Sequence, residues 1–196
     1  MRTKSLFLAA IASFFILSAC SVNVNKPAGE DGDKKVDIQT PMGGLHVSEG
    51  ADVRDVGLSV YPGAKPKPKD GNDNEEKSAN VNLSFGNFGL KVVALEFLSD
   101  DSPDKVVAYY SNELKKYGKV LQCAGTSGSG AHADIHIGKS DDDSDSGALT
   151  CGDSKGEGTE LKVGNKANQH IVSIKPNGKG TDFGLVYVRT RGKDTI

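Results

Sequence analysis

Apolar and polar residues alternate in short runs along most of the chain after residue 35, and the most regular section is residues 81–98. Two apolar-rich runs, residues 81–85 and 90–98, flank Gly86-Asn87-Phe88-Gly89. Runs of this kind joined by a short Gly-containing segment predict a β-hairpin. The run at residues 90–98 is apolar at both alternating positions, so we expect this strand in the middle of a sheet with both faces largely covered.

One helix is predicted over residues 103–117. Its apolar positions recur every four residues, at Val106, Tyr110 and Leu114, which is the spacing of one helix face. Ser102 suits the N-cap position, and Gly118 suits the left-handed residue that often ends a helix. We therefore expect this helix to pack one face against the sheet.

Shorter alternating runs predict further strands. Residues 36–38 and 45–47 predict a hairpin whose turn contains Gly43-Gly44, and residues 58–64 predict a strand that Pro62-Gly63 ends. In residues 65–80, Lys alternates with Pro before the sequence becomes acidic, which predicts an exposed loop. The remaining predicted strands are residues 119–123, 134–137, 148–151, 160–163, 170–175 and 183–189. The order predicts an α+β fold, an antiparallel sheet of short strands with one main helix packed on it.

The first residues have the pattern of an export signal. Arg2 and Lys4 precede an apolar run at residues 6–17, which is shorter than the roughly 20 residues of a membrane-spanning helix. Leu-Ser-Ala-Cys at residues 17–20 resembles the lipobox of bacterial lipoproteins. The resemblance implies that residues 1–19 are removed as a signal peptide and that Cys20 receives a diacylglyceryl group and an amide-linked acyl chain. The alternative is a plain signal peptide followed by an incidental cysteine.

Three segments follow from this interpretation: a signal peptide at residues 1–19, a disordered tether at 20–35 and a single α+β domain at 36–196. Residues 20–35 have few apolar side chains to bury, which favours disorder. Within the domain, the hairpin at 36–47 is expected at the periphery. Ser21, in place of Asp after the lipidated cysteine, implies an anchor in the outer membrane, facing the periplasm.

The charge composition limits the class of partner that we expect for the protein. The 196 residues include 24 Lys and Arg and 26 Asp and Glu, and loss of Arg2 and Lys4 with the signal leaves a net charge of about −4. This balance argues against a nucleic-acid partner, which normally needs a basic surface. The expected partners are the membrane, through the lipid on Cys20, and another envelope protein.

With Cys20 lipidated, Cys123 and Cys151 remain. An even pair of cysteines in an oxidising compartment favours a disulfide over two free thiols.

Two clusters are candidate metal sites. His132, Asp134 and His136 alternate along a predicted strand, so their side chains share one face and suit zinc; the alternative is a polar strand face. The segment from Asp142 to Asp153 partly resembles an EF-hand calcium loop, although Ser replaces two ligands and no helices flank it. The alternative there is a solvated hairpin tip.

Few other residues of the sequence have a pattern that indicates a functional role. His170 lies on the apolar side of its predicted strand, which indicates a partly buried structural histidine.

Tyr-Pro-Gly-Ala at residues 61–64, with Asp-Ser-Pro-Asp-Lys-Val-Val-Ala-Tyr-Tyr at 101–110, resembles a group of uncharacterised bacterial envelope proteins over residues 58–190. That resemblance implies an extracytoplasmic module and no catalytic residues.

The sequence therefore favours a lipid-anchored envelope protein that is not an enzyme and that binds a protein or has a structural role. The alternative is a lipoprotein that binds a small ligand or a divalent metal, calcium or zinc. Catalysis by residues far apart in the sequence is a third hypothesis.

Overall fold

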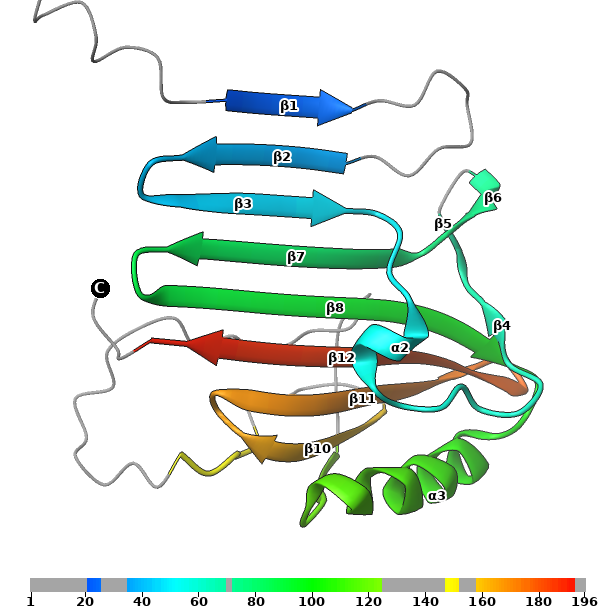
Figure 1. Ribbon diagram of the computed structural model, residues 1–196. Coiled ribbons are helices and arrows are strands. Elements are labelled where there is room, and N and C mark those ends of the chain that lie inside the picture. Colours follow the sequence, from blue (N-terminus) through cyan, green and yellow to red (C-terminus); the bar gives the residue numbers. More distant parts are fainter. Residues whose placement is uncertain (1–20, 26–34, 70–71, 125–146, 152–157, 193–196) are drawn as a thin grey trace, which may run out of the picture.

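The computed structural model describes residues 21–25, 35–69, 72–124, 147–151 and 158–192. These residues form a large antiparallel sheet with one main helix (Figure 1), so the predicted α+β class is confirmed. The strands of the main sheet lie in the order β1-β2-β3-β7-β8-β12-β11-β10-β9, β4 also pairs with β8, and β5 and β6 form a separate pair. Their bounds are β1 Ser21–Asn25, β2 Lys35–Thr40, β3 Gly43–Ser48, β4 Lys65–Pro66, β5 Pro68–Lys69, β6 Asn72–Glu76, β7 Ser78–Phe85, β8 Phe88–Ser99, β9 Leu121–Ala124, β10 Thr159–Asn165, β11 Asn168–Asn177 and β12 Gly180–Arg191.

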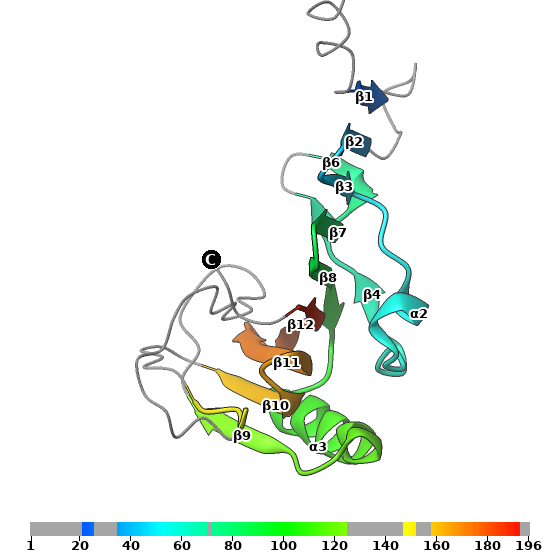
Figure 2. The same ribbon diagram turned by 60° about the vertical axis from the view of Figure 1, so that its left-hand side comes forward.

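The predicted helix is confirmed as α3, Pro103–Glu113, which continues into the 3₁₀ turn η1, Leu114–Tyr117. Ser102 occupies the N-cap position with extended backbone, but its side chain makes no capping hydrogen bond. A short helix that the sequence did not predict, α2 at Val53–Val56, precedes β4. Figure 2 shows α2 and α3 on the same side of the curved sheet.

Strand β8 has the central position that its apolar sequence predicted, between β7 and β12. The hairpin of β7 and β8 is also confirmed, with Gly86 and Asn87 in its turn. Gly86 has a φ of 54°, a conformation that costs glycine little. A positive φ at the first central residue is typical of the tight turns that join antiparallel strands.

The main core lies between the sheet and α3. It consists of alternate residues of the central strands and one face of the helix, and Val106, Tyr110 and Leu114 supply the helix face as predicted. The fully buried strand residues in this core include Val93, Leu161, Val163, Val172, Ile174, Phe183 and Leu185. Burying each large apolar side chain stabilises the fold by roughly 1.5–3 kcal/mol.

The opposite face of the central strands carries a second apolar cluster. Ile171, Val186 and Val188 are buried there, with Val92 and Ala94 of β8 packed against them. Apolar residues at both alternating positions of β8 therefore serve two clusters, one on each face of the sheet, which agrees with the sequence pattern.

The N-terminal strands extend the sheet away from the main core. The predicted hairpin is present as β2 and β3, and β3 pairs with β7. The prediction of a tether without structure over residues 20–35 is wrong at Ser21–Asn25, because this segment forms β1 and pairs with β2. Residues 21–25 include few large apolar side chains, but backbone hydrogen bonding to a free strand edge does not require them.

The turn of the first hairpin differs from the prediction. Pro41 and Met42 form it, and Gly43 and Gly44 already belong to β3. Pro41 has the fixed φ that suits the first central position of a turn. The Oγ1 atom of Thr40 accepts a hydrogen bond from the Gly43 N–H at 3.1 Å, which fastens the turn at its base.

The predicted strand at residues 58–64 is wrong, since this segment is irregular. It is nevertheless part of the core: Leu58 and Tyr61 are buried. Its alternation of apolar residues reflects packing beneath α3 without a neighbouring strand.

The exposed loop predicted at residues 65–80 is also wrong. The segment forms β4, β5 and β6 and the start of β7, and the backbone N–H of Lys67 donates to the carbonyl of Glu96 at 2.9 Å. The Nζ atom of Lys67 lies 2.6 Å from Asp182 Oδ2 and 3.2 Å from Glu96 Oε2. These ion pairs, together with the pairing of β4 with β8, hold the Lys-Pro run against the sheet.

The disulfide between Cys123 and Cys151 is present, with a Cα–Cα distance of 5.5 Å. It joins the end of β9 to residues 147–151, which are irregular, so the strand predicted at 148–151 is wrong. The disulfide, and not strand pairing, links the end of β9 to residues 147–151. Within the described residues, the helices are too short or too polar to cross a lipid bilayer.

Candidate functional site

A row of polar side chains crosses five strands of the main sheet. Asp37 on β2 lies opposite His46 on β3, and the row continues through Asn82 on β7, Lys91 on β8 and Arg189 on β12. Residues directly opposite each other in an antiparallel pair share a face, with Cβ atoms about 4.5–5.5 Å apart. The strand order thus brings together residues that are up to 152 positions apart in the sequence.

A second row lies two residues away along each strand and therefore on the same face. It consists of Gln39, Gly44, Ser84, Gly89 and Arg191. The two rows enclose a groove of about 320 Å³, which we call the cationic groove. Its lining residues are Gln39, Gly44, His46, Asn82, Leu83, Ser84, Gly89, Leu90, Lys91, Arg189 and Arg191.

Two glycines form part of the groove floor. A Cβ on Gly44 would lie 3.1 Å from the side-chain amide of Gln39, and a Cβ on Gly89 would lie 3.5 Å from the guanidinium of Arg191. The missing side chains let the long side chains of Gln39 and Arg191 lie low across the sheet. The side chains of Gln39 and Arg191 therefore form part of the groove floor above the two glycines.

Three cations line the groove from β8 and β12. The Nζ atom of Lys91 donates to Asp55 Oδ1 on α2 at 3.4 Å, which ties the groove to the short helix. Arg189 and Arg191 are exposed at their places in the two rows. On the far side of the groove, His46 Nδ1 lies 2.6 Å from Asp37 Oδ1.

This arrangement suits an anionic group. Guanidinium groups present several donors in a planar fork, which matches the two oxygens of a carboxylate. The side chains of Asn82, Ser84 and Gln39 offer further hydrogen-bond donors and acceptors beside the arginines. A ligand in this groove would meet cations on one side, neutral polar groups on its floor, and His46 with its carboxylate partner Asp37 on the opposite side.

His170 lies in a different environment, in contact with α2 and η1. Its ring stacks on Tyr117 with centroids 3.9 Å apart, and the ring of Tyr187 lies 4.9 Å away. Burial lowers the pKa of His170 to about 4, the nearby charge of Lys116 lowers the pKa further, and a hydrogen bond with the backbone of Val56 opposes them. The side chain is 8 % exposed, so the expected structural histidine is confirmed and is more deeply buried than predicted.

The residues predicted from sequence to bind lipid or metal lie outside the described residues. These are Cys20, the zinc candidates His132, Asp134 and His136, and the calcium candidates Asp142 and Asp153. In the described ranges, no three His, Cys, Asp or Glu side chains come together in a group that could hold a metal ion.

Sequence reasoning missed the cationic groove. Each strand carries between one and three of its residues, and Asn82 and Ser84 alternate with apolar residues as in any half-exposed strand. The signals available from the sequence were that alternation on β7 and the two arginines, Arg189 and Arg191, spaced two residues apart on β12. Strand order and register were needed to join the positions.

Comparison of the chain with models of protein families, with curated proteins and with solved structures gives no match.

Proposed function

We propose that the protein is a lipid-anchored, non-enzymatic module of the bacterial cell envelope that binds an acidic segment of a partner protein in the cationic groove. The anchor is inferred from the lipobox resemblance at residues 17–20. The observation that supports binding is the placement of Arg189 and Arg191 in adjacent rows on one exposed face, beside Asn82 and Ser84.

The size of the groove favours a segment of a larger partner. Its volume of about 320 Å³ is at the lower limit for sites that enclose a whole small molecule. It can accept one or two acidic side chains that project from a protein surface. Gly44 and Gly89 let Gln39 and Arg191 lie low across the sheet, which leaves room above them for such side chains.

The affinity should depend mainly on the two arginines. A hydrogen bond to a charged group contributes roughly 1.5–3 kcal/mol, and each 1.4 kcal/mol corresponds to about tenfold in Kd. Lys91 contributes less, because its ammonium group already contacts Asp55. Added salt should weaken binding, since exposed charges are screened.

The test measures fluorescence anisotropy of a fluorescein-labelled glutamate-rich peptide, with its glutamine counterpart as the control ligand. We expect binding of the glutamate peptide alone and at least about tenfold weaker binding to an Arg189→Gln, Arg191→Gln double variant. A Lys115→Gln, Lys119→Gln double variant has the same net charge, and both lysines are exposed outside the groove. Equal loss in both double variants, or no binding to the unmodified protein, would refute the groove as a binding site.

Anchoring is tested separately. A Cys20→Ala variant should lose acylation and remain unprocessed, as measured by lipid labelling in cells and by mass spectrometry of the purified protein. Normal labelling of that variant would refute the lipid anchor.

A further inference from the structure

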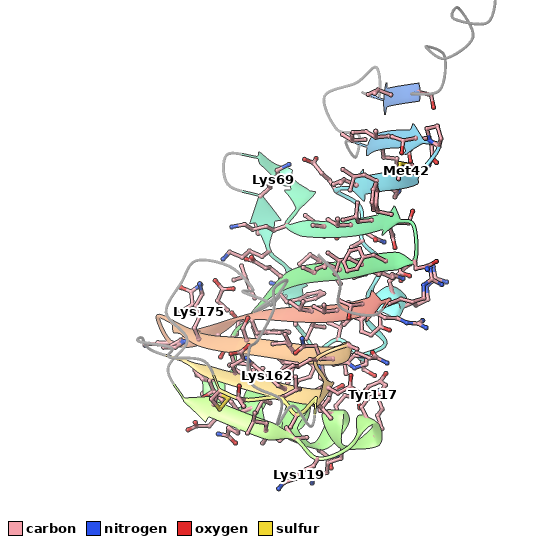
Figure 3. The ribbon with its side chains drawn as sticks, turned by 90° about the vertical axis from the view of Figure 1, so that its left-hand side faces the viewer. Met42, Lys69, Tyr117, Lys119, Lys162 and Lys175 are labelled. Atoms are coloured by element: carbon pink, nitrogen blue, oxygen red, sulfur yellow. A yellow bond between two sulfur atoms is a disulfide. The ribbon has the colours of Figure 1, made fainter. Side chains whose placement is uncertain are left out.

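Exposed apolar side chains gather at one end of the sheet. Among the described residues, the exposed large apolar side chains are Val22, Met42, Phe85 and Tyr117. Met42 is 66 % exposed in the β2–β3 turn, Phe85 is 55 % exposed at the end of β7, and Val22 is 64 % exposed near the start of β1. Tyr117 lies far from Met42, beside α3 (Figure 3).

The turns that carry Met42 and Phe85 are joined to each other. The backbone N–H of Gly86 donates to the carbonyl of Met42 at 2.9 Å, and Gly43 is the register partner of Phe85. A Cβ on Gly43 would lie 2.0 Å from the carbonyl oxygen of Ser84, so only glycine allows this close approach. Met42 and Phe85 therefore belong to one structural unit, which we call the apolar tip.

The chain also enters the sheet at this end. Ser21 begins β1 and is the register partner of Gln39, two residues before the β2–β3 turn begins at Pro41. Cys20 is covalently bonded to Ser21, with consecutive Cα atoms about 3.8 Å apart. Ser21 thus lies one strand from β2, which ends at the turn of Met42, and three strands from β7, which ends at Phe85. At the usual strand spacing, Ser21 is on the order of 10 Å from Met42 and about 15 Å from Phe85.

We infer that the apolar tip inserts into the surface of the same lipid leaflet that holds the acyl chains of Cys20. The inference rests on the lipid anchor of the proposed function and adds a second, noncovalent contact. Apolar side chains next to an acyl anchor gain free energy by entering the boundary between headgroups and acyl chains. The position of Ser21, which directly follows the expected anchor, at this same end of the sheet is what favours lipid over a protein as the occupant.

Membrane contact at the tip would determine how the domain is oriented. Gly44 and Ser84, which line the cationic groove, directly follow Gly43 and directly precede Phe85. The groove would consequently open beside the lipid surface, where an acidic segment of a neighbouring envelope protein can reach it. The β11–β12 turn, with Lys179 exposed, lies at the other end of the strands (Figure 1) and would point away from the lipid.

The chain contains no Trp, so a Phe85→Trp variant carries a single fluorescent reporter at the tip. The acylated full chain is reconstituted into vesicles of phosphatidylethanolamine and phosphatidylglycerol, with and without bromine on the lipid acyl chains. We expect a blue shift of the emission and quenching by the brominated lipid. A Met42→Trp variant should behave in the same way, whereas Lys179→Trp should show neither change.

The outcomes separate the inference from the anchor. Acylated Phe85→Trp and Met42→Trp proteins that float with the vesicles but are not quenched would overturn the inference and leave the anchor intact. Absence of acyl mass together with failure to float would overturn the anchor and the inference with it. A concentration-dependent blue shift of the Cys20→Ala, Phe85→Trp protein without lipid would overturn the inference in favour of a second copy of this chain at the tip.

Discussion

The hydroxyl of Tyr110 on α3 accepts a hydrogen bond from the backbone N–H of Tyr61 at 3.0 Å. The same hydroxyl donates to the carbonyl of Ser59 at 3.2 Å. Burial raises the pKa of Tyr110, which keeps the hydroxyl protonated and able to donate. A helix side chain thus supplies the hydrogen bonds that a neighbouring strand would otherwise provide to residues 58–64.

Replacement of Tyr110 by Phe should destabilise the protein by roughly 1–3 kcal/mol, because the buried N–H of Tyr61 loses its acceptor. The free energy of unfolding in urea measures this loss. Tyr109→Phe is the matched control, since the Tyr109 hydroxyl makes a longer contact, 3.5 Å, with the carbonyl of Val60. Equal losses in the two variants would contradict the role assigned to Tyr110.

His170 should make stability depend on pH between about 6.5 and 4. Its pKa is about 4 in the folded protein and near 6.5 in the unfolded chain. As the pH falls through this window, the unfolded chain binds a proton and the folded protein does not, so stability is lost. The expected loss is roughly 3 kcal/mol from neutral pH to pH 4.

A His170→Phe variant keeps an aromatic ring against Tyr117 and removes the titrating group. Urea unfolding at several pH values should show a much smaller loss in this variant over the same window. The lowered carboxyl pKa values of Asp101 and Glu113 affect stability at lower pH, below about 4.5. Unchanged pH dependence in His170→Phe would refute the role of His170.

Lys67 should contribute strongly to stability although it lies in a Lys-Pro run. Its side chain is 20 % exposed, and its partners Asp182 and Glu96 are 9 % and 12 % exposed. Burial lowers the pKa of Lys67, but hydrogen bonds and charge from Asp182 and Glu96 outweigh it, so the pKa is raised. The lysine therefore stays charged in the folded protein.

A Lys67→Met variant should lose roughly 3 kcal/mol of unfolding free energy, because removal of one partner leaves nearly buried carboxylates poorly compensated. Lys65→Met provides a control from the same run, since Lys65 is exposed, and should change stability by less than about 0.5 kcal/mol. Thermal or urea unfolding distinguishes the two. Similar values for both variants would show that the ion pairs add little.

Reduction of the disulfide should lower stability by roughly 3–4 kcal/mol, as expected for a bridge between residues 28 positions apart. Urea unfolding with and without dithiothreitol measures the difference. A Cys123→Ala, Cys151→Ser double variant should match the reduced protein and should not respond to the reductant. A response of the double variant would assign the effect to something other than this bridge.

Local patterns were sufficient to place many of the elements along the chain, although they did not identify the partners of each strand. Helix α3, the β7–β8 hairpin and the strands β9 to β12 follow from apolar periodicity and turn residues, because these signals act over only a few residues. The central place of β8 followed from its two apolar faces. The pairing of Cys123 with Cys151 followed from the number of cysteines.

Tertiary structure alone decided the features that depend on distant partners. The apolar pattern of residues 58–64 predicts a strand, but in the folded protein the Tyr110 hydroxyl bonds to backbone groups of this segment. The Lys-Pro run predicts an exposed Lys67, but in the folded protein its ammonium group pairs with Asp182 and Glu96. The cationic groove exists only because the sheet order places β3, β7, β8 and β12 side by side in one register. Side-chain alternation along a strand is encoded locally, whereas which strand lies next to it depends on the free energy of the whole packed sheet.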